Sequence, residues 1–466
     1  MTEASQSASE QEIKLYVKAP KVYPRETDGR FSRLRVLSAW VLLGLFYVLP
    51  WINLDGQQIV LFDLPARKFH IFGLVFWPQD FVMLALLLAI AALTLFFVTA
   101  LAGRLWCGYA CPQTVWTEVF LWMERFAEGS RNKRMRLDKQ PWNAEKIRKK
   151  ALKQFLYITF AAWTGITFVG FFTPIRELVP ALFTLQAGGW EWFWALFYGF
   201  ATYGNAGYLR EQVCKYMCPY ARFQAAMFDD DTLVISYDEK RGEPRGKRKR
   251  DADREELGLG DCIDCYGCVQ VCPTGIDIRD GLQIECIACA ACIDVCDEVM
   301  DKMGYPRGLI RYSTENAMAG RKSRILRPRI FIYLGALVAL TALFLVMLTG
   351  REMVDLDVLR DRTALYRMAG SDIENPFALK VTNRTEQPLR LEIAAAGIDG
   401  IRVVSPRQGF EVPADEVSNR PLTLAVPRDA LGPGMHEVEI LLSNERSGEV
   451  VNRSETRFYV PPEGRR

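Results

Sequence analysis

Two runs of four cysteines stand close together near the middle of the chain. Both read Cys-x-x-Cys-x-x-Cys-x-x-x-Cys, and their members are Cys262, Cys265, Cys268 and Cys272, followed by Cys286, Cys289, Cys292 and Cys296. This spacing is typical of ferredoxins that hold two [4Fe–4S] clusters. Three closely spaced cysteines can wrap a tight loop around three corners of an iron–sulfur cubane, and the fourth points along a short helix toward the other cluster. The runs therefore predict a site that accepts and releases single electrons.

The ligands of such paired runs are expected to cross over. The first cluster is predicted on Cys262, Cys265, Cys268 and Cys296, and the second on Cys286, Cys289, Cys292 and Cys272. Zinc is the alternative, but zinc sites usually pair one Cys-x-x-Cys with a distant second pair. Acidic residues such as Asp264 and Asp297 crowd the runs. They predict low reduction potentials, unless they form only a solvated acidic surface.

Four further cysteines form a second candidate site. Arg104–Gln113 reads RLWCGYACPQ and Cys214–Tyr220 reads CKYMCPY, so both segments contain Cys-x-x-x-Cys-Pro. The cysteines are Cys107, Cys111, Cys214 and Cys218. If each motif is helical, its two cysteines share one helix face, and the proline can kink the helix there. We expect the four thiols to converge on one site.

Several chemistries fit four such thiols. They could bind a soft metal as Cu(I), zinc or iron–sulfur, with the Met217 thioether as an additional ligand. They could also form a redox dithiol, or simply be buried small hydrophobic residues. The recurrence of the motif at equivalent places favours a functional site. Haem is not expected, because the chain has only two histidines, His70 and His436, and on the topology below His436 lies in the C-terminal domain.

Five apolar blocks near 20 residues long predict membrane spans. They cover residues 36–54, 81–101, 155–172, 190–208 and 330–348, and about 20 apolar residues are needed to cross a bilayer. Buried helices of a large soluble protein are the alternative, but such helices keep a polar face. Each Cys-x-x-x-Cys-Pro motif follows an even-numbered span, which indicates a duplicated hairpin.

Loop charges predict the orientation of the spans. Seven Lys and Arg residues precede the first span and eleven lie in Trp122–Lys153, against two in Asn53–Gln79 and one in Pro174–Gly189. The positive-inside rule places the N-terminus and both cysteine sites in the cytoplasm, and everything after Arg351 outside. In a bacterium this is a multi-pass inner-membrane protein with a periplasmic C-terminal domain. The net charge of +3 is too small to indicate nucleic-acid binding.

The fold class that follows is a multi-domain membrane protein. It combines an α-helical five-span membrane domain, an inserted ferredoxin-like domain and a C-terminal all-β immunoglobulin-like sandwich, which the period-two pattern of Leu422, Leu424 and Val426 indicates. The predicted boundaries are 1–35 for a loosely held cytoplasmic N-terminal tail, 36–227 for the membrane domain with four spans, 228–260 for a charged linker, 261–329 for the ferredoxin-like domain, 330–349 for the fifth span and 350–466 for the sandwich.

Together these features resemble the FixG/CcoG/RdxA family, called cytochrome c oxidase accessory proteins. The resemblance covers nearly the whole chain and rests on the two Cys-x-x-x-Cys-Pro segments, the tandem cysteine runs, the five spans and the trailing sandwich. It implies a role in assembling a cbb-type haem–copper oxidase, by reducing Cu(II) to Cu(I) before copper insertion. It also implies that Cys107, Cys111, Cys214 and Cys218 handle copper. Copper enters through the resemblance alone.

The leading hypothesis is a membrane-bound iron–sulfur oxidoreductase that acts as a cupric reductase. An electron-relay or quinol-oxidising subunit of a respiratory complex is the second hypothesis, and a redox-sensing assembly scaffold is the third. The expected partners are the lipid bilayer, oxidase subunits or their assembly factors, an unidentified electron donor and a second copy of the chain. No nucleic-acid partner is expected.

Overall fold

A computed structural model describes residues 21–462, apart from residues 55, 251, 362–363, 386 and 415. The chain divides into two compact units. The first contains the residues up to Leu74 together with Pro78–Thr341, and the second contains Val75–Trp77 together with the residues from Ala342 onward. All twelve cysteines belong to the first unit.

Three helices in the described part of the chain are long and apolar enough to cross a membrane. They are α1 (Arg30–Val48), which a short 3-10 turn extends to Trp51, α2 (Phe81–Ala102) and α14 (Pro328–Thr349). Few of their side chains are buried, and several leucines are largely exposed, as for Leu88 at 63%. Exposed leucines at this density are expected where a lipid bilayer replaces water.

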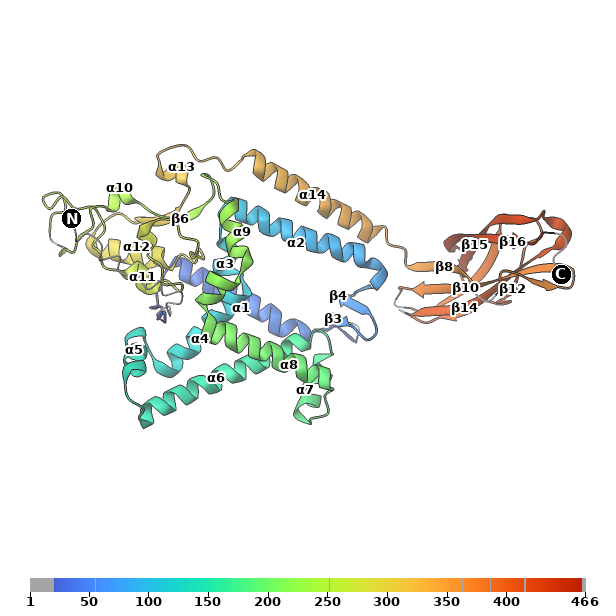
Figure 1. Cartoon of the computed structure of the whole chain (residues 1–466), viewed down its shortest axis with the longest axis horizontal. Helices are drawn as coiled ribbons and strands as arrows, with labels where there is room; N and C mark the ends of the chain where they lie inside the picture. Colours follow the sequence, from blue (N-terminus) through green and yellow to red (C-terminus); the bar gives the residue numbers. More distant parts are fainter. Residues whose placement is uncertain are drawn as a thin grey trace, which may run out of the picture. The chain divides into compact units, whose positions relative to one another are not determined.

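Helices also cover the third and fourth predicted spans. They are α6 (Ala144–Val169) and α8 (Gly189–Thr202), which continues as a π-helix over Tyr203–Leu209 and is linked to α6 through α7 (Ile175–Phe183). The two helices lie side by side (Figure 1). However, α6 begins with a charged stretch and α8 is only 14 residues long. The count of five spans therefore stays a prediction.

Short helices and strands connect these long helices. They are α3 (Leu105–Tyr109), α4 (Pro112–Glu128), α5 (Arg131–Lys139), α9 (Pro219–Met227), and the strands β1 (Asn53–Leu54), β2 (Gln57–Gln58), β3 (Val60–Asp63), β4 (Lys68–Ile71) and β5 (Leu74–Phe76). The amphipathic helix α4 packs against α6 through Phe120, whose ring lies 4.6 Å from that of Tyr157. It thereby links both Cys-x-x-x-Cys-Pro segments to the helical unit.

The ferredoxin-like part contains α10 (Glu239–Gly242), α11 (Gly267–Val271), α12 (Ala291–Met303) and α13 (Glu315–Met318). Its strands β6 (Val234–Tyr237) and β7 (Ile310–Ser313) pair antiparallel, with Ile235 opposite Tyr312. The charged linker predicted over 228–260 therefore supplies one strand of this sheet. The side chains of Ile235, Ile293 and Met300 share its core. The strand thereby adds apolar surface to a small domain, whose core also contains Cys262, Cys268, Ala288 and Ala290 of the cysteine loops.

The N-terminal segment differs from the prediction. Residues 1–20 of the predicted tail lie outside the described part, and α1 already begins at Arg30. Residues 21–29 are not loosely held. The Tyr23 hydroxyl donates to Asp138 over 2.5 Å, and the Arg25 amide donates to the carbonyl of Gln270 over 2.8 Å. These bonds hold the segment between α5 and the ferredoxin-like part.

The second unit contains the predicted sandwich. Its strands are β8 (Val354–Arg360), β9 (Arg367–Ala369), β10 (Asp372–Asn383), β11 (Leu389–Ala396), β12 (Arg402–Ser405), β13 (Phe410–Val412), β14 (Val417–Pro427), β15 (Gly434–Asn444) and β16 (Val450–Val460). One sheet has the order β12-β14-β10-β8 with β9 on β10, and the other has the order β13-β11-β15-β16. Leu379, Leu391, Leu422, Ile440 and Phe458 fill the space between them. Leu422, Leu424 and Val426 belong to the same core, as their period-two pattern predicts.

Candidate metal centres

The two cysteine runs fold into loops of the same shape. Asp264 and Tyr266 flank the second cysteine of the first run and have φ of 50° and 57°, while Ala288 and Ala290 flank the second cysteine of the other run and have φ of 53° and 57°. Left-handed backbone is uncommon for residues other than glycine. Its recurrence at the same two places shows that both runs follow one local fold. The first loop continues into α11 and the second into α12.

Each loop lines a small cavity. Cys262, Cys265, Cys268 and Cys296 line one cavity, and Cys272, Cys286, Cys289 and Cys292 line the other, to which Cys268 also contributes. These sets match the two ligand sets that crossed ligation predicts. The other walls of the second cavity are mainly apolar, as Ile235, Ile276, Ile278 and Ile287 show. Four thiol donors around an apolar cavity fit a [4Fe–4S] cluster.

The spread of the side chains also separates a cluster from a single ion. Among the described residues, no three Cys, His, Asp or Glu side chains come close enough together to bind one metal ion directly. A zinc ion would draw its thiolates together through Zn–S bonds of about 2.3 Å. A cubane instead holds its cysteines at its outer corners, farther apart. The arrangement therefore favours iron–sulfur over zinc.

The two cavities differ in exposure and in charge. Cys265 in the first is exposed, whereas no cysteine of the second set is. Beside the first cavity, the Arg279 guanidinium pairs with Asp264 at 2.7 Å and with Asp277 at 2.6 Å. Hydrogen bonding to Arg279 holds the pKa of Asp277 below its usual range. The acidic residues of the sequence are thus partly neutralised, which weakens the prediction of low potentials.

The Cys-x-x-x-Cys-Pro motifs do not form single helices. Cys107 lies in α3, but Cys111 is extended, with φ of −61° and ψ of 127°, and Pro112 opens α4. Cys214 lies in a π-helix over Val213–Met217, and Cys218 is the extended residue before α9. The predicted shared helix face and proline kink are wrong. A proline at the first helical position needs no N–H partner and already has a helical φ, so it starts a helix rather than bending one.

The four membrane-edge cysteines nevertheless lie near one another. Burial raises the pKa of Cys107 to about 12, and the negative charge of Cys111 adds to the effect. Burial likewise raises the pKa of Cys214 to about 11, with further contributions from Cys111 and Cys218. A redox dithiol needs an accessible thiolate, and the burial of Cys107 and Cys214 disfavours one. Met217 is 59% exposed, unlike the largely buried thiols beside it.

This second thiol group borders the second ferredoxin-like loop. Cys107 and Cys214 both pack against the apolar side chains of Val271, Ile287, Cys289, Ala291 and Val295. At Gly108, a Cβ atom would lie 2.8 Å from the carbonyl oxygens of Ile287 and Ala288. Only glycine allows α3 to approach that loop so closely. The two candidate centres are therefore direct neighbours.

Sequence reasoning missed Arg104, which joins the two centres. Its guanidinium donates to the carbonyls of Ile284 and Cys286 in the second loop and to the carbonyl of Ala221 in α9. The residue belongs to the RLWC segment, three positions before Cys107. The sequence shows that an arginine is present, but not that it is buried.

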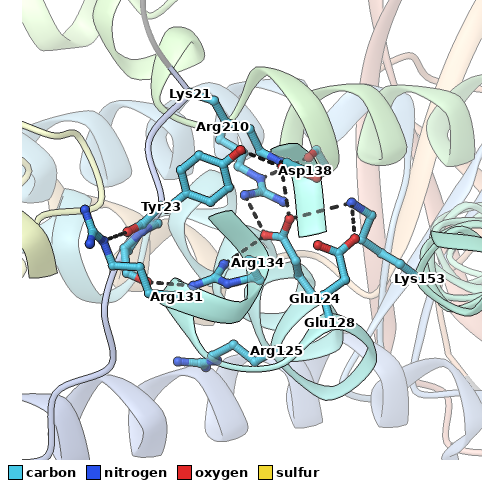
Figure 2. Close-up of polar contacts among 12 residues, drawn as sticks. Lys21, Tyr23, Glu124, Arg125, Glu128, Arg131, Arg134, Asp138, Lys153 and Arg210 are labelled. Atoms are coloured by element: carbon cyan, nitrogen blue, oxygen red, sulfur yellow. Dashed lines mark hydrogen bonds and ion pairs between the residues drawn. The ribbon is translucent and has the colours of Figure 1, made fainter. Parts of the chain in front are cut away.

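Sequence reasoning also missed a buried ion network beside the second motif (Figure 2). Glu124 and Glu128 of α4 are fully buried, and the cations around them are Lys21, Arg134, Lys150, Lys153 and Arg210. Burial alone would raise the pKa of Glu124, but Arg210, Lys21, Lys153 and Arg134 lower it to about 2. Arg210 stands four residues before Cys214, so the network anchors the start of that motif.

Three family models match this chain. A 4Fe-4S dicluster domain matches residues 209–315 and confirms the two-cluster iron–sulfur prediction. A 4Fe-4S binding domain matches residues 84–129, which include Cys107 and Cys111. An Ig-like fold found at the C-terminus of FixG matches residues 344–461 and confirms the sandwich.

Curated proteins match nearly the whole chain. The nitrogen fixation protein FixG of Rhizobium meliloti is 38% identical, over 90% of this chain and 86% of its own. Protein RdxA of Cereibacter sphaeroides is 40% identical, over 86% of this chain and 87% of its own. Among solved structures, a FixG-related protein from Vibrio parahaemolyticus is 28% identical over 23% of this chain and 97% of its own, with a TM-score of 0.22.

Proposed function

Because this chain belongs to the FixG/RdxA family and is a membrane protein that transfers electrons through iron–sulfur clusters, we propose that it reduces Cu(II) to Cu(I) for the assembly of a cbb-type cytochrome c oxidase. Cys262, Cys265, Cys268 and Cys296 would hold one cluster, and Cys286, Cys289, Cys292 and Cys272 the other. A bound [4Fe–4S] cluster takes up one electron and releases it again. Copper would be reduced at Cys107, Cys111, Cys214 and Cys218.

One observation carries the proposal. Cys107 and Cys214 pack directly on the apolar side chains around Cys289, and Gly108 lets α3 touch the same loop. Electron transfer slows steeply with distance, so direct contact between the two thiol groups supports passage from one to the other. Each Cu(II) ion would take one electron and become Cu(I).

The chemistry of the four cysteines favours the reduced ion. Thiolates are soft ligands that select Cu(I), and a buried site disfavours the higher charge of Cu(II). Because burial raises the pKa of Cys107 and Cys214, copper must displace their protons on binding. The residues therefore bind the product more strongly than the substrate, which draws the reduction forward.

The decisive experiment replaces Cys107, Cys111, Cys214 and Cys218 together by serine. The purified protein is reduced without oxygen, excess reductant is removed, and Cu(II) is added with a colorimetric Cu(I) chelator. We expect the variant to lose Cu(I) formation while keeping about eight iron atoms per chain, four for each cluster. Met217→Leu is the matched control, because Met217 lies inside the second motif but is exposed.

Two results would contradict copper reduction at these cysteines. Undiminished Cu(I) formation in the serine variant would place the reaction elsewhere. A wild-type iron content of about twelve atoms that falls to about eight in the variant would instead assign the four cysteines to a third cluster. The match of a 4Fe-4S binding domain to residues 84–129 makes this second result worth measuring.

A specific feature also favours quinol as the electron donor. An apolar groove between α1 and α4 is lined by Trp40, Tyr47, Trp122 and the stem of Glu118. Glu118 also lines a pocket that reaches Cys214 and Cys289. Quinol oxidation there would release two electrons, one for each cluster, and two protons, of which one would pass to the Glu118 carboxylate and the other to water. Cluster reduction by a quinol without copper would support this donor, and a requirement for a soluble cytoplasmic donor would contradict it.

The location and the partners follow from the same arrangement. The exposed apolar helices α1, α2 and α14 would face lipid, and the basic segment Trp122–Lys153 would keep both cysteine sites in the cytoplasm. The sandwich would then lie in the periplasm of a bacterium, where oxidase subunits or assembly factors could bind it. Protease cleavage of the sandwich in intact spheroplasts would support this topology, whereas protection until the membrane is opened would contradict it.

A further inference from the structure

Arg104 occupies an unusual electrostatic position. Its side chain is 5% exposed, and one guanidinium joins three segments that lie far apart in the sequence. The acceptors are the carbonyls of Ile284 and Cys286 in the second cysteine loop and of Ala221 after the second Cys-x-x-x-Cys-Pro motif. These bonds use three of the five N–H donors of the guanidinium and leave its positive charge.

In the described part of the chain, no carboxylate is paired with this charge. Among the residues that the structure describes, none forms an ion pair with Arg104. A buried charge is costly unless an opposite charge lies nearby. The groups that could carry one are the thiols around it, because the charge of Arg104 acts on Cys107, Cys214 and Cys286. Those thiols become anionic when they bind a metal or a cluster.

The surroundings of the first cavity are different. Arg279 is neutralised twice, by Asp264 and Asp277. Arg248 donates to the carbonyl of Cys262 over a long 3.4 Å, but it is only partly buried and its guanidinium lies over the Tyr305 ring. Water therefore screens its charge. The second loop has another cation, since Arg35 donates to the carbonyl of Cys289 over 2.6 Å.

We propose that Arg104 is the counter-charge that makes the second cluster the preferred electron acceptor of the two. A buried positive charge stabilises an added electron, so this arginine directs electrons from the exposed first site toward the membrane-edge cysteines. One electron leaves the first cluster and one arrives at the second, with no bond broken and no proton moved. The inference rests on the ligand sets of the proposed function. Within them, Arg104 is a positioning residue that acts through charge.

The test is a redox titration of the full-length protein, followed by EPR. It compares the wild type with Arg104→Met, which keeps the size but loses the charge, and with Arg104→Lys, which keeps the charge. The difference between the two midpoint potentials gives the equilibrium constant for sharing one electron between the clusters. We expect Arg104→Met to lower the preference for the second cluster at least about tenfold, and Arg104→Lys to retain most of it. Arg248→Met, the matched control at the first site, should change it by less than about threefold.

The possible outcomes are distinct. The inference would be overturned if Arg104→Met had full iron content and an unchanged equilibrium constant for electron sharing between the clusters. It would also be overturned if Arg104→Lys lowered that constant as much as Arg104→Met does. If Arg104→Met loses its iron, Arg104→Gln, which loses the charge but keeps two N–H donors for the carbonyls, provides the same measurement, and an unchanged constant there overturns the inference. A wild type without two EPR-active clusters would refute the proposed ligand sets instead.

Discussion

Two buried arginines precede the two Cys-x-x-x-Cys-Pro motifs, and their surroundings differ. Arg210 pairs with Glu124 at 3.0 Å and donates to the Tyr157 hydroxyl over 2.8 Å. Arg104 donates to backbone carbonyls and, within the described residues, to no carboxylate. The motif is duplicated, but its electrostatics are not. The second motif is held by an ion network in which Arg210 is already paired. At the first motif, the positive charge of Arg104 can instead interact with thiolates that form when the cysteines bind a metal or a cluster.

The largest expected effect comes from removing the charge at the centre of the network. Glu124→Gln keeps the shape of the side chain but leaves Arg134, Arg210 and Lys153 facing one another in a buried space. Removal of one partner from a buried ion pair typically costs about 3–5 kcal/mol. We expect a loss of this size in thermal unfolding of the detergent-solubilised protein. Glu118→Gln on the same helix is the control, since its side chain is 30% exposed and pairs with Arg125 only at 3.4 Å.

The same network predicts a pH dependence of stability. The pKa of Glu124 falls from 4.5 to about 2 in the folded chain, so the unfolded state binds more protons between these values. The stabilisation is therefore complete above about pH 4.5 and disappears as the pH falls toward 2, and it amounts to about 3 kcal/mol. The unfolding midpoint of the wild type should therefore fall as the pH is lowered across this range. In Glu124→Gln, the share of this fall that comes from protonation of Glu124 should be missing. If the unfolding midpoints of the variant and the wild type fall equally steeply with pH, the assignment to Glu124 is wrong.

The comparison also shows what the sequence could and could not predict. The spacing of the cysteine runs was enough to predict two iron–sulfur clusters, because cysteines three residues apart wrap one loop. Alternation of Leu422, Leu424 and Val426 was sufficient for the sandwich, because strand side chains alternate between faces. These features are local, so they can be read from neighbouring residues.

Other features depend on residues that are distant in the sequence. The proline after Cys111 could equally bend a helix or begin one, and only the extended backbone of Cys111 decides. The cations of Trp122–Lys153 were read as a topology signal, yet Arg134, Lys150 and Lys153 are partners of buried carboxylates. Whether an arginine has a carboxylate partner depends on the tertiary fold, which is why Arg104 was missed.

The contact of the first motif can be tested at Gly108. Gly108→Ala would place a Cβ atom 2.8 Å from two carbonyl oxygens of the second loop, so α3 must move away. Overpacking of this kind typically costs about 1–3 kcal/mol. We expect a lower unfolding temperature and slower Cu(I) formation at unchanged iron content. Gly44→Ala is the control, because no atom lies within 4 Å of a Cβ at Gly44. Equal Cu(I) rates in both variants would show that the contact does not matter for electron transfer.

The smallest effect is expected at an ion pair outside the network. Lys149 and Glu145 lie one turn apart on α6 at 2.5 Å, but they are 29% and 54% exposed. Solvent screens such a pair, and ordering two long side chains offsets most of the attraction. Lys149→Ala should therefore leave the unfolding midpoint within experimental error of the wild type. This variant isolates burial as the cause of the Glu124 effect, because both pairs involve the same kinds of charge on adjoining helices. A loss as large as that of Glu124→Gln would mean that any charge change on these helices destabilises them, and the contrast between Arg104 and Arg210 would then lose its meaning.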